Sequence, residues 1–168
     1  MTISMHSASV PVFVRMLGNL LTWLDKAEQY AEGRKFDTSV YLTLRLAPDM
    51  LPFTRQIQIA SDAAKGCAAR LAGIENPKWE DKEASFADLR ERVRKTLEFV
   101  QSVSAAQIDG SEQREIVIPT RSGEGLHFDG ETYLKHYALA NFYFHLSMTY
   151  ALLRHAGVEL GKSDFLGR

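Results

Sequence analysis

The feature that most constrains the fold is the spacing of apolar residues in four separate segments of this 168-residue chain. In each segment the apolar residues recur at steps of three and four, which places them on one face of an α-helix. Such a helix needs a neighbour against which its apolar face is buried. Four of these helices in a chain of this length predict an all-α fold, a four-helix bundle around a single core.

The first two segments show the pattern most clearly. The first runs from about Val10 to Ala31 and is followed by Gly33, a residue type that commonly ends a helix. The second is expected to begin near Pro48–Asp49, because proline suits the first turn of a helix, and to end at Gly73. Its apolar positions are Met50, Phe53, Ile57, Ala60, Ala64, Cys67 and Leu71.

The third and fourth segments each start at a residue that can cap a helix. Ser85 forms a capping-box pattern with Asp88, and Asp129 precedes the fourth segment, which continues to about Ala156. The fourth segment is apolar on nearly every side, which predicts that it is the most central helix. The charged residues of the third helix are expected to form a solvated face. They include Arg90, Arg92, Arg94 and Lys95.

Two shorter stretches alternate apolar and polar residues, a pattern typical of strands. Tyr41–Leu46 is too short for the pattern to decide its structure. Residues 114–119 and 125–128 flank a glycine-containing turn and predict a short β-hairpin before the last helix. A hairpin of this size is unstable alone, so we expect it to lie against the bundle. Residues 1–168 are therefore expected to form one domain.

Composition narrows the function classes. The 20 basic and 21 acidic residues give a net charge of −1 and are well mixed, unlike the basic clusters of nucleic-acid-binding proteins. The single cysteine, Cys67, cannot form an internal disulfide and is expected to be a small core residue rather than a nucleophile. The chain starts without a signal-peptide pattern and has no apolar run of membrane-spanning length. We therefore expect a cytoplasmic protein with neither a nucleic-acid nor a membrane partner.

The polar residues inside the apolar fourth helix are the candidates for function. Asn141 and His145 lie one turn apart on a core-facing stripe, where a polar group without a hydrogen-bond partner costs about 1–3 kcal/mol. Gln58 and Asp62 lie on a flank of the second helix that can supply such partners. Two interpretations stay open: a structural hydrogen-bonded pair, or a ligand or metal pocket between facing helices. For Asp62, simple exposure to water is a further alternative.

Three stretches resemble an uncharacterised bacterial family, domain of unknown function 1993. They are residues 9–13, residues 47–62 and, most specifically, residues 141–165. The family is grouped with the DinB-like proteins, so the resemblance implies a DinB-like bundle that often forms dimers. Many DinB-like proteins hold a divalent metal through one histidine on the second helix and two, four residues apart, on the fourth. Some of these relatives are thiol-dependent transferases or isomerases.

Carried over residue by residue, the resemblance implies a degenerate metal site. His145 falls on one histidine position, whereas Asn141 and Gln58 fall on the other two. Neutral amides are poor ligands for zinc and nickel, so no tightly bound metal and no other cofactor is expected. A zinc or nickel ion at this place would need additional ligands. The candidates are Asp62, Asp49 and His136.

These observations support three hypotheses. The first is binding of a small molecule in an interior polar pocket, without a tightly bound metal, by His145, Asn141, Gln58 and Asp62. The second is a metal-dependent thiol transferase or isomerase of the DinB type, and the third is a structural dimeric module without an active site. A homodimer is expected from the resemblance. The consecutive aromatic residues at 142–144 support it weakly, because they cannot all point into one core.

Overall fold

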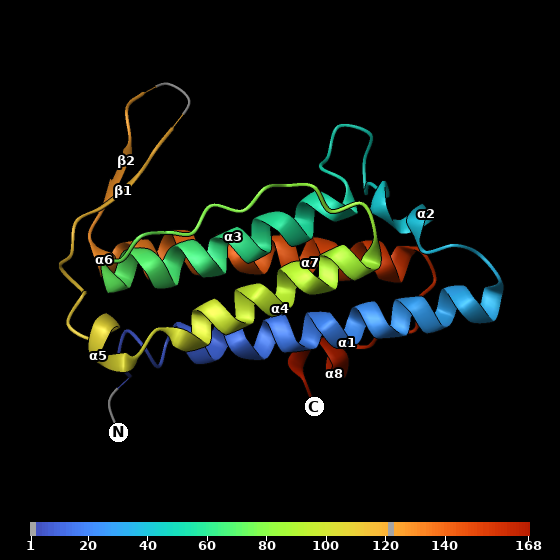
Figure 1. Cartoon of the computed structure of the whole chain (residues 1–168), viewed down its shortest axis with the longest axis horizontal. Helices are drawn as coiled ribbons and strands as arrows, with labels where there is room; N and C mark the ends of the chain where they lie inside the picture. The colour runs from blue at the N-terminus through green and yellow to red at the C-terminus, as the bar shows by residue number, and fades with distance from the viewer. Residues whose placement is uncertain (1–2, 121–122) are drawn as a thin grey trace.

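Each of the four predicted apolar stripes lies on a long helix (Figure 1). The computed structural model describes residues 3–120 and 123–168. Its long helices are α1 (Val10–Arg34), α3 (Phe53–Ala72), α4 (Phe86–Ser102) and α7 (Leu139–His155). The prediction of an all-α four-helix bundle is confirmed.

Shorter elements connect and cover the long helices. They are α2 (Ser39–Leu42), α5 (Ala105–Ile108), β1 (Ile116–Ile118), β2 (Leu126–Phe128), α6 (Gly130–Thr132), the π-helix η1 (Tyr133–Ala138) and α8 (Lys162–Leu166). The two strands form the predicted antiparallel hairpin, with Val117 opposite His127. The turn expected over 120–124 includes residues 121–122, which lie outside the described residues. The fourth predicted helix is thus built from α6, η1 and α7 in succession.

The directions of the long helices depart from a simple antiparallel arrangement. The colours in Figure 1 show α1 and α7 running one way and α3 and α4 running the other way. α3 and α4 are parallel because residues 73–85, which connect them, return along the length of the bundle as an extended segment. We call this segment the crossover strap. These two consecutive long helices therefore run in the same direction.

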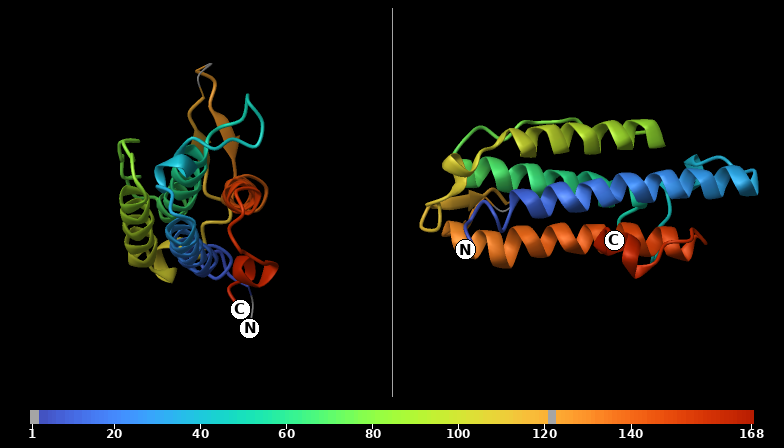
Figure 2. Two further views of the ribbon diagram at one scale, coloured as in Figure 1. Left: turned by 90° about the vertical axis from the view of Figure 1, so that its right-hand side faces the viewer. Right: turned by 90° about the horizontal axis from the view of Figure 1, so that it is seen from below.

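The core draws on all four long helices and is centred on α3. Figure 2 shows α3 between α4 and α7, and both helices pack against it, so the prediction that the fourth helix is the most central is wrong. α7 instead leaves Tyr143 37% and Phe144 53% exposed on its outer face. Within residues 3–120 and 123–168, no helix is long and apolar enough to cross a membrane. The predicted stripe residues of α3 are fully buried, namely Phe53, Ile57, Ala60, Ala64, Cys67 and Leu71.

Local chemistry sets several helix ends as predicted. The Ser85 hydroxyl oxygen accepts a hydrogen bond from the backbone N–H of Asp88 at 3.1 Å. The Asp129 carboxylate accepts one from the backbone N–H of Thr132 at 2.8 Å. Both residues therefore cap the N-terminal turns of their helices. Gly73 ends α3 with a φ of 68°, a left-handed conformation that glycine adopts without strain.

Two boundaries differ from the prediction. α1 continues past Gly33 and is capped by Lys35, which takes the left-handed conformation with a φ of 59°. α3 begins at Phe53 rather than near Pro48–Asp49, because the preceding residues turn to let the Phe53 N–H bond the Leu44 carbonyl at 2.8 Å. The alternating run Tyr41–Leu46 holds the end of α2 and a turn, not a strand.

Candidate functional site

The side chain of His145 is hydrogen-bonded to that of Gln56, a residue that the sequence analysis did not single out. His145 is 7% exposed, and its Nδ1 lies 2.7 Å from Gln56 Oε1. The Gln56 amide nitrogen donates to the Leu51 carbonyl at 2.9 Å, so its oxygen is the atom that faces the ring. Since an amide oxygen only accepts, this arrangement places the proton of the neutral imidazole on Nδ1. The lone pair of His145 is therefore on Nε2.

The surroundings of His145 favour its neutral form. Burial lowers the pKa of His145, and the nearby Arg55 guanidinium lowers it further. Both effects act against a positive charge on the ring. At neutral pH the His145 side chain is thus an uncharged hydrogen-bonding group.

Asn141 and Asp62 meet at a cavity between α3 and the η1–α7 segment. The cavity has a volume of about 150 Å³, and we call it the Asn141 pocket. A cavity of this size holds a ligand of about six non-hydrogen atoms. The structure therefore brings two of the four predicted site residues together. The residues that line the Asn141 pocket are Ile59, Asp62, Ala63, Arg70, Ile118, Tyr133, Tyr137, Ala138 and Asn141.

Arg70 and Tyr133 form the polar end of the Asn141 pocket. Arg70 Nη1 donates to the Tyr133 hydroxyl oxygen at 3.1 Å, and the guanidinium carbon lies 5.9 Å from the centre of the Tyr133 ring. Gly66 makes this placement possible, because a Cβ atom there would lie 2.4 Å from Arg70 Nη1. Neither residue was predicted from the sequence. The sequence signal that could have drawn attention to Arg70 is the glycine one helical turn before it, at Gly66.

Two buried groups that can lose a proton, the Tyr133 phenol and the Cys67 thiol, lie near Arg70. Burial raises the pKa of the Tyr133 phenol and that of the Cys67 thiol well above their ordinary values. Tyr133 therefore stays a neutral hydrogen-bond donor. Cys67 is fully buried and stays a thiol, and a thiol without thiolate character is a poor nucleophile. This agrees with the expectation that Cys67 serves as a small core residue.

The π-helix and the hairpin shape one wall of the Asn141 pocket. Tyr133 and Tyr137 both belong to η1, and their rings stack with centroids 5.9 Å apart. Phe128 of β2 packs against Tyr137 at 5.3 Å, and Ile118 of β1 lines the cavity. Short π-helical stretches inside α-helices occur frequently at functional sites. The hairpin thus covers the pocket as well as the end of the bundle.

Gln58 faces away from His145 and belongs to a different cluster. It is 2% exposed, and its amide nitrogen donates to Glu83 of the crossover strap at 2.6 Å. Arg92 of α4 donates to the other Glu83 oxygen at 2.8 Å and to Asp62 at 3.0 Å. The expected meeting of Gln58 with His145 is therefore not observed. Gln58 lies two residues after Gln56 in α3, so its side chain points about 200° away around the helix axis.

Arg92 also corrects the prediction for the charged face of α4. Its side chain is 2% exposed, and it contacts Asp81 of the crossover strap at 3.0 Å in addition to Glu83 and Asp62. Arg94 and Lys95 are exposed as expected. The Arg90 side chain is only 12% exposed, because it pairs with Asp25 and Glu28 of α1. Arg92 is buried because the strap passes over α4 and supplies the opposite charges.

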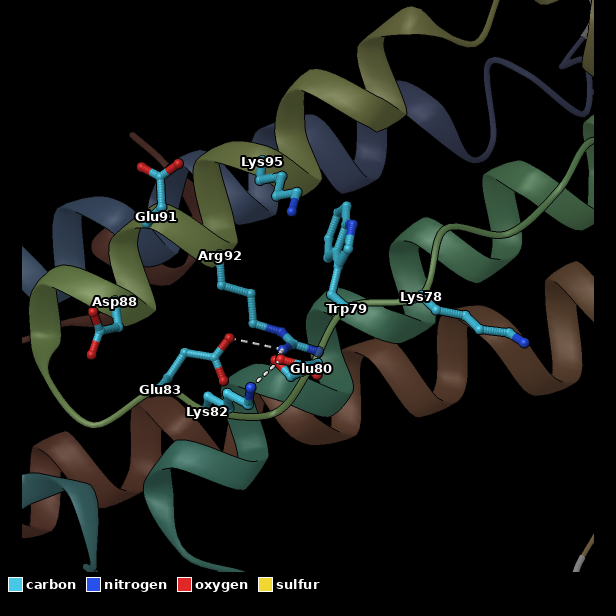
Figure 3. Close-up of a pocket in the computed structure, with 9 residues that line it drawn as sticks. All are labelled: Lys78, Trp79, Glu80, Lys82, Glu83, Asp88, Glu91, Arg92 and Lys95. Atoms are coloured by element: carbon cyan, nitrogen blue, oxygen red, sulfur yellow. Dashed lines mark hydrogen bonds and ion pairs between the residues drawn. The ribbon is translucent and has the colours of Figure 1, made fainter.

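A groove of about 500 Å³ lies beside this cluster, between the crossover strap and α4 (Figure 3). Trp79 stands at one end, and its ring centre lies 4.9 Å from the Lys95 ammonium and 4.6 Å from that of Lys65. The lining side chains carry four basic and four acidic groups. They are Lys78, Lys82, Arg92 and Lys95 with Glu80, Glu83, Asp88 and Glu91. The groove therefore offers no net charge to a ligand.

The donor set around His145 does not match a zinc or nickel site. In the described part of the chain, no three histidine, cysteine, aspartate or glutamate side chains lie close enough together to hold a metal ion. The side chain that meets the His145 ring is an amide, which is a poor ligand for these metals. The proposed extra ligands Asp49 and His136 are both solvent-exposed.

Comparison with known proteins agrees with the architecture. The family model described as "Domain of unknown function (DUF1993)" matches residues 5–166. A crystal structure of a DinB family member protein from Shewanella denitrificans is 39% identical, with a TM-score of 0.89, over 97% of this chain and 92% of that chain. No protein of curated function matches the sequence. The bundle, its hairpin and these matches together show that the chain belongs to the DUF1993 family of DinB-like proteins.

Proposed function

We propose that the protein binds a small polar molecule in the Asn141 pocket, without a tightly bound metal. The observation that supports this most is a cavity of about 150 Å³ lined by both Asp62 and Asn141. It lies between α3 and the η1–α7 segment, and helix bundles build their binding sites from side chains on such facing helices. The amide of Asn141 has no hydrogen-bond partner among the residues that the structure describes. It is therefore available to a ligand.

His145 has a supporting place in this proposal. It lies one turn along α7 from Asn141, and its hydrogen bond to Gln56 joins α7 to the first turn of α3. Such a bond between the two helices holds the walls of the pocket at a constant separation. His145 and Gln56 are thus positioning residues, and Gln58 acts on the opposite side of α3 through the crossover strap.

The test is a thermal-shift screen of small thiols, carboxylates, amides and amines against a variant with a filled pocket. Ala63 lines the cavity and is only half-buried, so Ala63→Leu occludes the pocket with little strain. Ala87→Leu, at an exposed position of α4, is the matched control. A ligand at ten times its Kd stabilises the fold by about 1.4 kcal/mol, which raises the Tm by about 3–6 °C.

We expect at least one compound to raise the Tm of the wild type and of Ala87→Leu but not of Ala63→Leu. The proposal fails if no compound in the screen shifts the wild type, or if Ala63→Leu responds as the wild type does. The second result would place the binding site elsewhere on the molecule.

Self-association is a separate part of the proposal. It is supported by the two exposed aromatic residues of α7, Tyr143 and Phe144, which give its outer face an apolar character. A second copy of the chain would cover this face in a homodimer.

A further inference from the structure

We propose that the ligand of the Asn141 pocket is a small carboxylate, held by Arg70 and Tyr133. This inference rests on the proposed function and names its ligand class. It comes from the balance of hydrogen-bond donors and acceptors around the cavity, and from a cationic side chain of the lining that has no ion-pair partner among the described residues.

Arg70 is that group. Its hydrogen bond to Tyr133 is with a neutral phenol, and no carboxylate of residues 3–120 or 123–168 forms an ion pair with it. Half-buried arginines usually meet an acidic group, because the guanidinium fork suits a carboxylate. The close approach to Gly66 keeps the guanidinium of Arg70 against α3 and Tyr133 rather than extended into water. A ligand carboxylate would supply the missing partner.

Tyr133 adds a hydrogen-bond donor, its hydroxyl group, that finds no acceptor in the part of the chain that the structure describes. Its hydroxyl oxygen receives the hydrogen bond from Arg70, so its own hydrogen is free to be donated. Tyr133 is 1% exposed, and within the described residues no carbonyl or carboxylate accepts that hydrogen. Buried hydroxyl groups are rarely left in this state. An acceptor inside the pocket satisfies Tyr133 and Arg70 together.

Asp62, the only acidic residue of the lining, does not cancel the charge of Arg70. One oxygen of its carboxylate lies 3.0 Å from the Arg92 guanidinium and 3.2 Å from the Lys65 ammonium. Asp62 is thus already compensated on the side facing α4 and the crossover strap. The pocket keeps a positive end at Arg70 and an amide at Asn141, which suits an anion more than a cation.

The size of the cavity limits the ligand. About 150 Å³ accommodates roughly six non-hydrogen atoms, so a carboxylate with a short apolar chain fits and a large metabolite does not. Ile59 and Ile118 provide an apolar surface for that chain. Propionate, propionamide and propylammonium are suitable probes, because they have nearly the same shape and differ in charge.

The experiment is a titration of the isotope-labelled full chain with each probe, followed by NMR at the Arg70 Nε–H and the Asn141 side-chain amide. Arg70→Gln removes the cation and Tyr133→Phe removes the hydroxyl. Gly66→Ala displaces the guanidinium through its new Cβ. Arg94→Gln, an exposed arginine of α4, is the matched control. The Tm of each variant is measured to show that it is folded.

In the wild type and in Arg94→Gln, we expect the affinity for propionate to be at least about tenfold higher than the affinity for propionamide. A hydrogen bond to a charged group is stronger than one to a neutral group by about this amount. Arg70→Gln and Gly66→Ala should lose this preference, and Tyr133→Phe should reduce it. An equal or better affinity for propionamide or propylammonium in the wild type would overturn the inference and leave pocket binding intact. An undiminished preference in Arg70→Gln would overturn it too. If none of the three probes binds and no compound of the wider screen does, the proposal that the Asn141 pocket binds a ligand is itself overturned.

Discussion

Replacing Arg92 with methionine tests whether the buried charge cluster holds the crossover strap against the bundle. Methionine keeps most of the apolar stem and removes the guanidinium, which contacts Glu83, Asp62 and Asp81 at 2.8–3.0 Å. Breaking a buried ion pair costs about 3–5 kcal/mol. The Asp62 and Asp81 side chains are 46% and 38% exposed and regain water, whereas that of Glu83 is 11% exposed and stays buried. We therefore expect a loss near the lower limit, about 3 kcal/mol.

Urea denaturation of four proteins measures this loss: the wild type, Arg92→Met, Arg92→Met with Glu83→Gln, and Arg94→Met. The double variant should recover a large part of the stability, because most of the cost comes from the stranded carboxylate of Glu83. Arg94 is exposed, so its replacement should change the free energy of unfolding by less than about 0.5 kcal/mol. Hydrogen exchange should accelerate within residues 73–85 of Arg92→Met. A loss below about 1 kcal/mol, or no recovery in the double variant, would refute the argument.

Three further predictions concern His145, metal content and assembly. His145→Ala should destabilise the fold by about 2–4 kcal/mol, through a cavity and an unpaired Gln56. Because the fold holds the pKa of His145 below its usual 6.5, the unfolded chain takes up the proton first as the pH falls. Stability from this group is thus present above about pH 6.5 and lost below it, and urea melts of His145→Gln should lack that component. Plasma mass spectrometry of the purified protein should find zinc, nickel, cobalt and iron well below one equivalent, and a full equivalent that survives a mild chelator would contradict the donor-set argument. Light scattering should give twice the 18.9 kDa monomer mass, and Phe144→Lys should shift the mass toward the monomer; a monomeric wild type at micromolar concentration would count against the homodimer.

The sequence by itself determined the elements whose causes are local. The apolar stripe of α3 needs only a period of 3.6 residues, and all its positions within the helix are buried. The caps at Ser85 and Asp129 and the ending of α3 at Gly73 each depend on atoms within four residues. The hairpin likewise follows from two alternating runs around a turn. The assignment to the DinB-like family came from the resemblance of three stretches to that family, and no local pattern indicates it.

Only the tertiary structure decided which polar residues meet. Gln56 rather than Gln58 faces His145, because the rotation of α3 about its axis is set by packing against α4 and α7. Arg92 is buried because the crossover strap covers it, and its charged neighbours in the sequence do not reveal this. The contact of Arg70 with Tyr133 joins residues 63 positions apart. Local patterns place a residue on a helix face with an uncertainty of one or two positions, and for side-chain chemistry that uncertainty exceeds the reach of a hydrogen bond.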